Sequence, residues 1–371
     1  MSNSSDIAAL LEGREVCVCA GSGGVGKTTS SAAIAMGMAS RGLRVAVLTI
    51  DPAKRLANSL GLEELGNEAR QVEEKRFTDA GLEMKGELWA MMLDPKRTFD
   101  DLIHKFASDE GARDQVLENR IYQQISNAVA GSQEYMAMEK LYELHDEGGY
   151  DLLVLDTPPT RNALDFLDAP ERLSRFIDSR SLQFFMKPGR SGLKLFGRGG
   201  GMVFSVLKRV TGVDLLQDLS EFFNGFADMA EGFRQRSTGV TELLSDDRSL
   251  FLIVTSPQAD SIDEAIYFRR RLKERDMPFG GVVVNRMHEA PGGGRDNVEK
   301  ALTPDLGEAL AVRVANNLDD YRALAERDQE NVTRLAEELE GEPLIIVPYL
   351  DDDVHDVAGL AVMNEHLFAS A

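Results

Sequence analysis

Short runs of apolar residues alternate with longer stretches of helical spacing along most of the chain. In seven of these runs the apolar positions are mostly consecutive rather than alternating, as in strands whose two faces are both covered by helices. The runs lie at residues 16–20, 43–50, 88–93, 151–155, 250–255, 281–285 and 344–347. This rhythm of strands and helices predicts an α/β fold, a doubly wound and mostly parallel sheet.

The first predicted strand leads directly into a glycine-rich loop. Residues 21–28 match the motif G-x-x-x-x-G-K-[ST], and residues 29–41 predict a helix that stops at Gly42. Glycines let backbone N–H groups curl around an anion, and the helix N-terminus adds partial positive charge. In this motif Lys27 reaches the β- and γ-phosphates and the Thr28 hydroxyl holds Mg²⁺. The pattern predicts a P-loop NTPase.

Polar side chains follow three of the predicted strands. Asp51 follows the second strand, Asp156 the fourth and Asn285 the sixth. Ligands of such folds bind at the carboxyl ends of the strands. Asp156, after four apolar residues, fits a carboxylate that holds Mg²⁺ through water, and Asp51 is the better candidate to orient the attacking water. The Asn285 amide has the donor and acceptor that adenine requires. Taken singly, Asp51 or Asn285 is better explained as a capping or turn residue.

Composition and charge limit which partners and which cellular location we expect for this protein. The chain has 371 residues, a net charge of −21 and a pI near 4.7, which disfavours nucleic acid as a partner. The N-terminus lacks a basic region and no uncharged apolar run is long enough to span a membrane, so we expect a cytoplasmic protein. Cys17 and Cys19 are the only cysteines, and both are expected in the core. We expect residues 1–371 to form a single P-loop ATPase domain.

Several segments are similar to those of known ATPase families. The loop from Ser22 resembles the deviant Walker A loop, K-G-G-V-G-K-T, of dimeric ATPases. The segments that begin at Asp51 and Asp156 resemble switch I (D-P-A-H) and switch II (D-T-A-P-T-G-H) of the ArsA family, which contains the arsenite-efflux ATPase and the ATPase that guides tail-anchored membrane proteins. Residues 93–96 resemble a third family segment, L-D-P-K, and residues 347–350 resemble its adenine-side loop.

The resemblance implies an ATPase that acts as a dimer, with ATP and Mg²⁺ as cofactors. It implies that Asp51 positions water, that Asp156 belongs to switch II, and that Asn285 and Pro348 flank adenine. It also implies that the phosphates and Mg²⁺ are bound by the loop residues Gly23, Gly24, Val25, Gly26, Lys27, Thr28 and Thr29.

Ser22 is an informative departure from the family. By the resemblance, this position carries a lysine that reaches the partner's nucleotide, with a charge that stabilises the transition state as an arginine finger does. We expect a related partner subunit to supply the missing cation in a heterodimer. The alternatives are a homodimer that is a slow ATPase switch, or a local replacement by Lys54 or Arg161. The chain also lacks the cysteine cluster of the arsenite branch and the C-x-x-C of the tail-anchor branch.

Residues 168–245 are predicted to form a helical, phenylalanine-rich insertion, far longer than an ordinary crossover. Within residues 215–233, apolar positions recur at helical spacing and define one face. Residues 187–213 are basic and apolar without a single acid. This inner segment is either a helical tip whose cations pair with the acidic remainder, or a contact for a hydrophobic protein client or membrane surface.

These features together predict a Mg²⁺-dependent ATP-binding and hydrolysing switch that couples ATP to a hydrophobic or membrane-associated client. One alternative is a nucleotide-bound regulatory or scaffold subunit of a heterodimer with little activity of its own, which Ser22 favours. Another is a ligase related to dethiobiotin synthetase, which the long apolar insertion and the two switch segments disfavour.

Overall fold

The computed structural model describes most of the chain, in the ranges 6–51, 54–120, 122–123, 133–157, 163–178, 215–292 and 295–368. The chain divides into two compact units. The first unit comprises Met1–Met92, Gly149–Ala163 and Ser245–Ala371, and the second comprises Leu93–Gly148 and Leu164–Leu244. The interpretation as a single domain stays a prediction.

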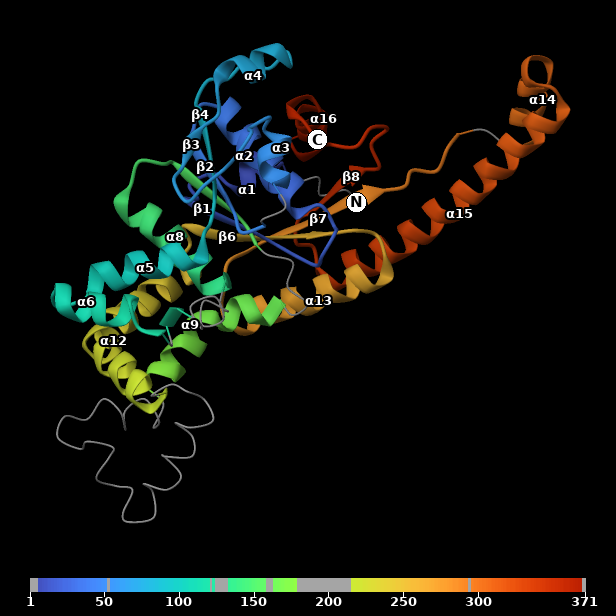
Figure 1. The fold of residues 1–371 in the computed structure, drawn as a ribbon. Coiled ribbons are helices and arrows are strands. Elements are labelled where there is room, and N and C mark those ends of the chain that lie inside the picture. The colour runs from blue at the N-terminus through green and yellow to red at the C-terminus, as the bar shows by residue number, and fades with distance from the viewer. Residues whose placement is uncertain are drawn as a thin grey trace. The chain divides into compact units, whose positions relative to one another are not determined.

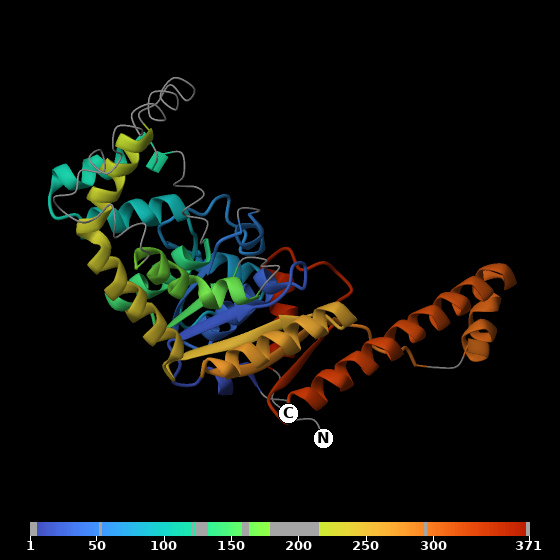
Figure 2. The same cartoon turned by 90° about the horizontal axis from the view of Figure 1, so that it is seen from below.

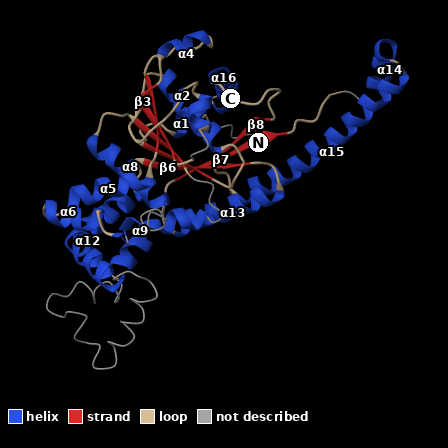
Figure 3. Cartoon of the chain, viewed as in Figure 1, coloured by secondary structure: helices blue, strands red, loops and turns tan. Residues whose placement is uncertain are grey.

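The first unit is built on a sheet of eight strands in the order β3-β4-β2-β5-β1-β6-β7-β8 (Figures 1 and 3). The strands are β1 (Val16–Ala20), β2 (Arg44–Thr49), β3 (Arg70–Gln71), β4 (Glu87–Met92), β5 (Leu152–Asp156), β6 (Ser249–Thr255), β7 (Phe279–Met287) and β8 (Leu344–Pro348). All neighbouring strands are parallel except β3 and β4. The predicted α/β class and mostly parallel sheet are confirmed.

The seven predicted strands are all present, and the count of seven is wrong by one. β3 consists of only Arg70 and Gln71, which are exposed and pair antiparallel with β4. Two exposed polar residues carry no hydrophobic pattern, so this edge strand left no signal in the sequence.

Helices cover both faces of this sheet. α2 (Lys27–Ser40) and α16 (Val357–Leu367) lie on one face, and α13 (Ala259–Glu274) and α15 (Glu308–Glu338) lie on the other (Figure 1). Figure 2 shows α13 and α15 running side by side. The remaining helices described in this unit are α1 (Ile7–Leu10), α3 (Arg55–Ser59), α4 (Glu74–Asp79) and α14 (Arg295–Leu306).

The core of the first unit lies around α2 and the central strands. Every residue of β1, β5 and β6 is buried, and α2 buries most of its small side chains against the sheet. Cys17 and Cys19 are unpaired and fully buried, as predicted. The core of this unit therefore forms where α2 packs on the central strands.

The second unit is helical in its described part. Its helices are α5 (Pro95–Phe106), α6 (Glu110–Leu117), α8 (Gln133–Glu147), α9 (Ala163–Ile177) and α12 (Leu215–Ser245). Phe222, Phe226 and Phe233 of α12 are buried. The Phe226 and Phe233 rings stack with centroids 5.0 Å apart, and Phe233 also stacks on Phe99 of α5 at 5.6 Å. The described part of the predicted apolar face, at Phe222, Phe226, Met229 and Phe233, is buried in the unit's own core.

Candidate nucleotide-binding site

The predicted phosphate-binding loop joins β1 to α2 and fits tightly against its neighbours. A Cβ added to Gly21 would lie 2.0 Å from the Val254 carbonyl oxygen. Gly26 has a φ of 95°, and a Cβ there would lie 2.3 Å from the Asn285 side-chain nitrogen. That nitrogen donates a hydrogen bond to the Val25 carbonyl at 3.0 Å. Glycine is therefore required at both positions by close approach, and at Gly26 also by the left-handed backbone.

Lys27 is the first residue of α2, and its side chain is only 6% exposed. Its Nζ donates a hydrogen bond to the Ser22 carbonyl at 2.7 Å. Burial lowers the pKa of this amine, while the negative charges of Asp156 and Asp51 oppose that shift. The Ser22 carbonyl thus holds the Lys27 amine against the loop. The negative charges of the Asp156 and Asp51 carboxylates act on the amine there.

Thr28 and Asp156 meet although 128 residues separate them. The Thr28 hydroxyl donates to Asp156 Oδ2 at 2.6 Å, and the Thr49 hydroxyl donates to the same oxygen at 2.7 Å. Burial raises the pKa of Asp156 to about 6, against the opposing effect of these two hydrogen bonds and the Lys27 charge. Asp156 Oδ1 is buried and has no hydrogen-bond partner in the described part of the chain.

This donor set fits Mg²⁺. Mg²⁺ prefers oxygen ligands and keeps much of its water, so it needs one or two protein oxygens together with substrate phosphates. The Thr28 hydroxyl and the unpartnered Asp156 Oδ1 provide such oxygens beside the phosphate loop. Among the described residues, no group of three or more His, Cys, Asp or Glu side chains is placed to hold a metal. A site of the zinc type is therefore not formed by those residues.

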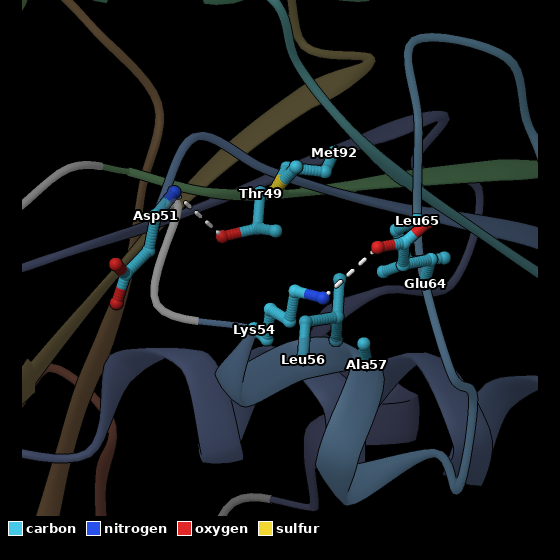
Figure 4. Close-up of a pocket in the computed structure, with 8 residues that line it drawn as sticks. All are labelled: Thr49, Asp51, Lys54, Leu56, Ala57, Glu64, Leu65 and Met92. Atoms are coloured by element: carbon cyan, nitrogen blue, oxygen red, sulfur yellow. Dashed lines mark hydrogen bonds and ion pairs between the residues drawn. The ribbon is translucent and has the colours of Figure 1, made fainter.

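Asp51 lies one strand away, at the end of β2, and its side chain is 19% exposed. It lines a pocket of about 230 Å³ together with Thr49, Lys54 and Glu64 (Figure 4). The Asp51 N–H donates to the Thr49 hydroxyl at 3.2 Å, and Arg55 Nε lies 3.7 Å from its carboxylate. The Asp51 carboxylate is thus partly open to solvent, at the same sheet edge as Asp156.

Lys54, one of the proposed local replacements for the missing cation, lines the same pocket. Its Nζ pairs with Glu64 Oε1 at 3.0 Å (Figure 4). The backbone of Lys54 is left-handed, with a φ of 56°, and the residue caps the N-terminus of α3. In this conformation the charge of Lys54 is balanced by Glu64.

Three predicted residues line a second pocket, of about 300 Å³. Thr29 comes from α2, Asn285 from β7 and Pro348 from the end of β8. Asn285 is buried, and one of its amide hydrogens is used on Val25. The amide oxygen and the remaining hydrogen are the groups that could recognise a base. The geometry therefore brings these three residues together, and it adds a loop-anchoring contact for Asn285 that the sequence did not predict.

Two features beside the phosphate loop were not predicted from the sequence. Arg286 has a left-handed backbone, with a φ of 63°, and its Nη1 donates to the Gly24 carbonyl at 3.3 Å. His288 Nδ1 lies 2.6 Å from the buried Asp328 Oδ2 on α15. With Gly23 and other loop residues they line a pocket of about 200 Å³. A left-handed arginine near the end of β7 leaves no hydrophobic pattern, and the partner of His288 is 40 residues away.

Some predicted features lie outside the described residues. These are the rest of the switch II segment at residues 158–162, with Arg161, and the basic and apolar segment 187–213, the predicted contact for a client or membrane surface. None of the helices in the described ranges is both long and apolar enough to cross a bilayer.

The chain matches the model of one known protein family over most of its length. The model of the family described as "Anion-transporting ATPase" matches residues 14–294. The matched range includes the phosphate loop and the three strand-end residues Asp51, Asp156 and Asn285, while Pro348 lies beyond it.

Curated relatives share moderate sequence identity over most of their length. The chain is 26% identical to ATPase GET3 of Podospora anserina over 268 residues, which are 72% of this chain and 71% of that protein. It is 27% identical to ATPase get3 of Aspergillus terreus over 272 residues, with the same two shares. With ATPase GET3 of Kluyveromyces lactis the identity is 26% over 279 residues, 72% of this chain and 70% of that protein.

Proposed function

The chain belongs to the anion-transporting ATPase family and is an ATPase, and on this premise we propose that it is a Mg²⁺-dependent switch that couples ATP to the binding of a hydrophobic or membrane-associated client. One observation carries the nucleotide part of the proposal. The loop threonine Thr28 and the strand-end Asp156 share a hydrogen bond, and the second Asp156 oxygen is buried without a partner among the described residues. A buried, unpartnered carboxylate oxygen is costly unless a ligand uses it.

Each of the site residues then has its own role in ATP hydrolysis. The loop N–H groups and Lys27 bind the phosphates, and Lys27 exchanges the Ser22 carbonyl for a phosphate oxygen. Thr28 and Asp156 hold Mg²⁺, which when bound neutralises charge on the β- and γ-phosphates. Asp51 orients the water for in-line attack on the γ-phosphate by accepting its hydrogen bond. The 19% exposure of Asp51 and the pocket beside it support this role.

We assign the base of the nucleotide to the pocket formed by Thr29, Asn285 and Pro348. Its volume of about 300 Å³ is at the lower end of the range for small-molecule sites. Asn285 offers the amide oxygen and one hydrogen to adenine while its other hydrogen stays on Val25. Because Val25 belongs to the phosphate loop, the Asn285 side chain would contact both the base and the loop, and binding of the base would therefore depend on the position of the loop.

The dimer and its missing cation remain proposals. Ser22 provides no charge, and Lys54 is paired with Glu64, which favours a cation from a partner subunit over replacement by Lys54. This observation also favours the second candidate, a nucleotide-bound subunit of a heterodimer with little activity of its own. The client part rests on the family and on the composition of segment 187–213. The buried phenylalanine face of α12 does not add to it, because that face already packs within the second unit.

The test is steady-state phosphate release from Mg²⁺·ATP by the purified chain across a range of protein concentrations, with Lys27→Ala as the control. Turnover per subunit that rises with concentration and is lost in the control supports a self-sufficient homodimeric ATPase. Tight ATP binding without turnover supports the heterodimer subunit instead. Absence of ATP binding by the unmodified chain would refute both candidates.

A further inference from the structure

Thr49 occupies the point where the two functional strand ends meet. β2 and β5 are parallel neighbours, and their register pairs Thr49 directly with Asp156. The Thr49 side chain is buried, with the residue only 2% exposed. Its hydroxyl donates to Asp156 Oδ2 at 2.7 Å and accepts from the Asp51 N–H at 3.2 Å. One side chain therefore contacts both the proposed metal-binding carboxylate and the backbone of the residue proposed to orient water.

The direction of these two bonds follows from the chemistry of the groups. The Asp51 N–H is only a donor, so the hydroxyl oxygen must accept from it. The single hydroxyl proton is then available for the Asp156 carboxylate, which in its ionised form is only an acceptor. The Thr49 hydroxyl thus uses its proton on Asp156 and a lone pair on the Asp51 N–H, and turning the proton away from Asp156 would break the donated bond.

Hydrogen bonds from two hydroxyl groups fix the plane of the Asp156 carboxylate. Thr28 and Thr49 both donate to Oδ2, at 2.6 and 2.7 Å, while Oδ1 keeps no partner in the described structure. A carboxylate otherwise turns about its Cβ–Cγ bond and exchanges its oxygens. Two donors on one oxygen hold the other oxygen in one direction. If the Thr28 hydroxyl turns to a metal ion, Thr49 is the donor that still holds the carboxylate.

We propose that Thr49 is a positioning residue that presents Asp156 Oδ1 to Mg²⁺ and ties the backbone of Asp51 to the same carboxylate. This inference rests on the proposed function of Asp156 and Asp51 and adds the residue that couples them. Thr49 does not touch the nucleotide, and it acts through its two neighbours. Figure 4 shows the Asp51 N–H pointing at the Thr49 hydroxyl at the edge of the pocket.

The experiment compares Thr49→Val and Thr49→Ser in the full chain. Valine keeps the shape and removes the hydroxyl, whereas serine keeps the hydroxyl and removes a methyl group. Thr255→Val is a matched control, since Thr255 is equally buried at the end of β6 in the same sheet, but its hydroxyl donates to the Ser261 carbonyl. ADP affinity is measured by titration calorimetry in EDTA and across a range of Mg²⁺ concentrations, and phosphate release from ATP is measured in parallel.

In Thr49→Val the affinity for ADP without metal is expected to stay within about twofold of that of the unmodified chain. The Mg²⁺ concentration at which ADP binding is half-maximally strengthened should rise about tenfold, because the variant loses one hydrogen bond to a charged group. Its kcat should fall at least about tenfold, with the KM for ATP within about threefold at saturating Mg²⁺. Thr49→Ser should restore both values to within about threefold, and Thr255→Val should leave the Mg²⁺ dependence unchanged.

The inference is overturned if Thr49→Val has the Mg²⁺ dependence of the unmodified chain, or if Thr255→Val shifts it equally. Failure of Thr49→Ser to restore the Mg²⁺ dependence would also overturn it, because the methyl group rather than the hydroxyl would then matter. If the unmodified chain binds Mg²⁺·ADP but releases no phosphate, the proposal of a self-sufficient ATPase fails, and the Mg²⁺ titration still tests Thr49.

Discussion

At the scale of single residues, the proposed function of Asp156 comes with a cost in stability. Its carboxylate is buried at the end of β5, and two hydroxyls and the Lys27 charge only partly offset the loss of water. The pKa of Asp156 is raised from 3.8 to about 6. A charged group kept in such a place without its ligand is a frequent feature of functional sites.

The sign of this shift predicts how stability depends on pH. The native state holds its proton up to pH 6, while the unfolded chain loses it near pH 4. Stability of the nucleotide-free protein therefore falls as pH rises from about 4 to 6, by ~3 kcal/mol for two pKa units. Asp156→Asn keeps an oxygen for Thr28 and Thr49 but has no charge. We expect it to be more stable than the unmodified chain at pH 7, by up to ~3 kcal/mol, and equally stable near pH 4.

Urea unfolding of both proteins in EDTA between pH 4 and 8 measures this difference. The same variant should lose Mg²⁺-dependent phosphate release, so stability and activity change in opposite directions. A variant that is less stable than the unmodified chain at pH 7 would show that the carboxylate is satisfied in the absence of metal, contrary to its buried and unpartnered Oδ1.

At the scale of secondary-structure elements, α8 and α12 are joined by a buried ion pair in the second unit. Arg236 Nε donates to Glu139 Oε1, and both side chains are almost fully buried. Burial raises the pKa of Glu139, and Arg236 opposes that shift. The guanidinium also lies over the Tyr142 ring, 4.2 Å from its centroid. The charge of Arg236 is what makes a buried Glu139 carboxylate tolerable.

We predict that Arg236→Met destabilises the protein by ~3–5 kcal/mol, because it leaves Glu139 buried without its partner. Adding Glu139→Leu should recover most of this loss, since two apolar side chains replace the pair. Arg234→Met is the matched control on the same helix, because Arg234 pairs with Asp178 at 2.7 Å on the surface, and it should cost less than ~1 kcal/mol. Urea unfolding measures all three, and equal losses for Arg236→Met and Arg234→Met would contradict the prediction.

The start of the last helix shows how an element boundary depends on local geometry. The acidic run at residues 351–353 precedes α16 but does not cap it. In the structure the cap is Asp356, whose carboxylate accepts from the Gly359 N–H at 2.8 Å. Both sites offer an aspartate before an apolar helix, and the position of the cap is decided by where the chain turns.

At the scale of the whole molecule, the question is where the transition-state cation comes from. By the resemblance to dimeric ATPases, Ser22 occupies the position of a lysine that reaches the partner's nucleotide. The Ser22 Oγ is buried without a partner in the described structure. Lys54 is held by Glu64. If the chain forms a homodimer of the family type, then restoring a lysine at position 22 should restore the missing charge across the interface.

We predict that Ser22→Lys raises phosphate release per subunit at least about tenfold at protein concentrations that saturate dimer formation, because such a cation accelerates phosphoryl transfer strongly. Ser22→Met adds similar bulk without charge and should not raise turnover. Phosphate release and sedimentation velocity are measured together across protein concentration. Equal turnover of the lysine and methionine variants, with ATP binding kept in both, would indicate that the cation has another source.

The sequence by itself determined the features that depend on local order. Consecutive apolar runs identified all strands except β3, because a strand buried on both faces needs apolar residues throughout. The glycine-rich motif identified the phosphate loop, since few sequences can wrap a backbone around an anion. The expectation that Asp51, Asp156 and Asn285 lie near one edge of the sheet followed from the rule that parallel strands present their carboxyl ends at one edge, although β7 continues two residues beyond Asn285.

Only the tertiary structure decided which of these residues touch. The strand order places β5 between β2 and β1, and that order brings Thr49 and Thr28 onto one oxygen of Asp156 from positions more than 100 residues away. It also places Asn285 on the loop carbonyl of Val25 and Arg286 on that of Gly24. A threonine inside an apolar strand carries no pattern of its own. Its role arises from the register of the neighbouring strand, which no local stretch of sequence specifies.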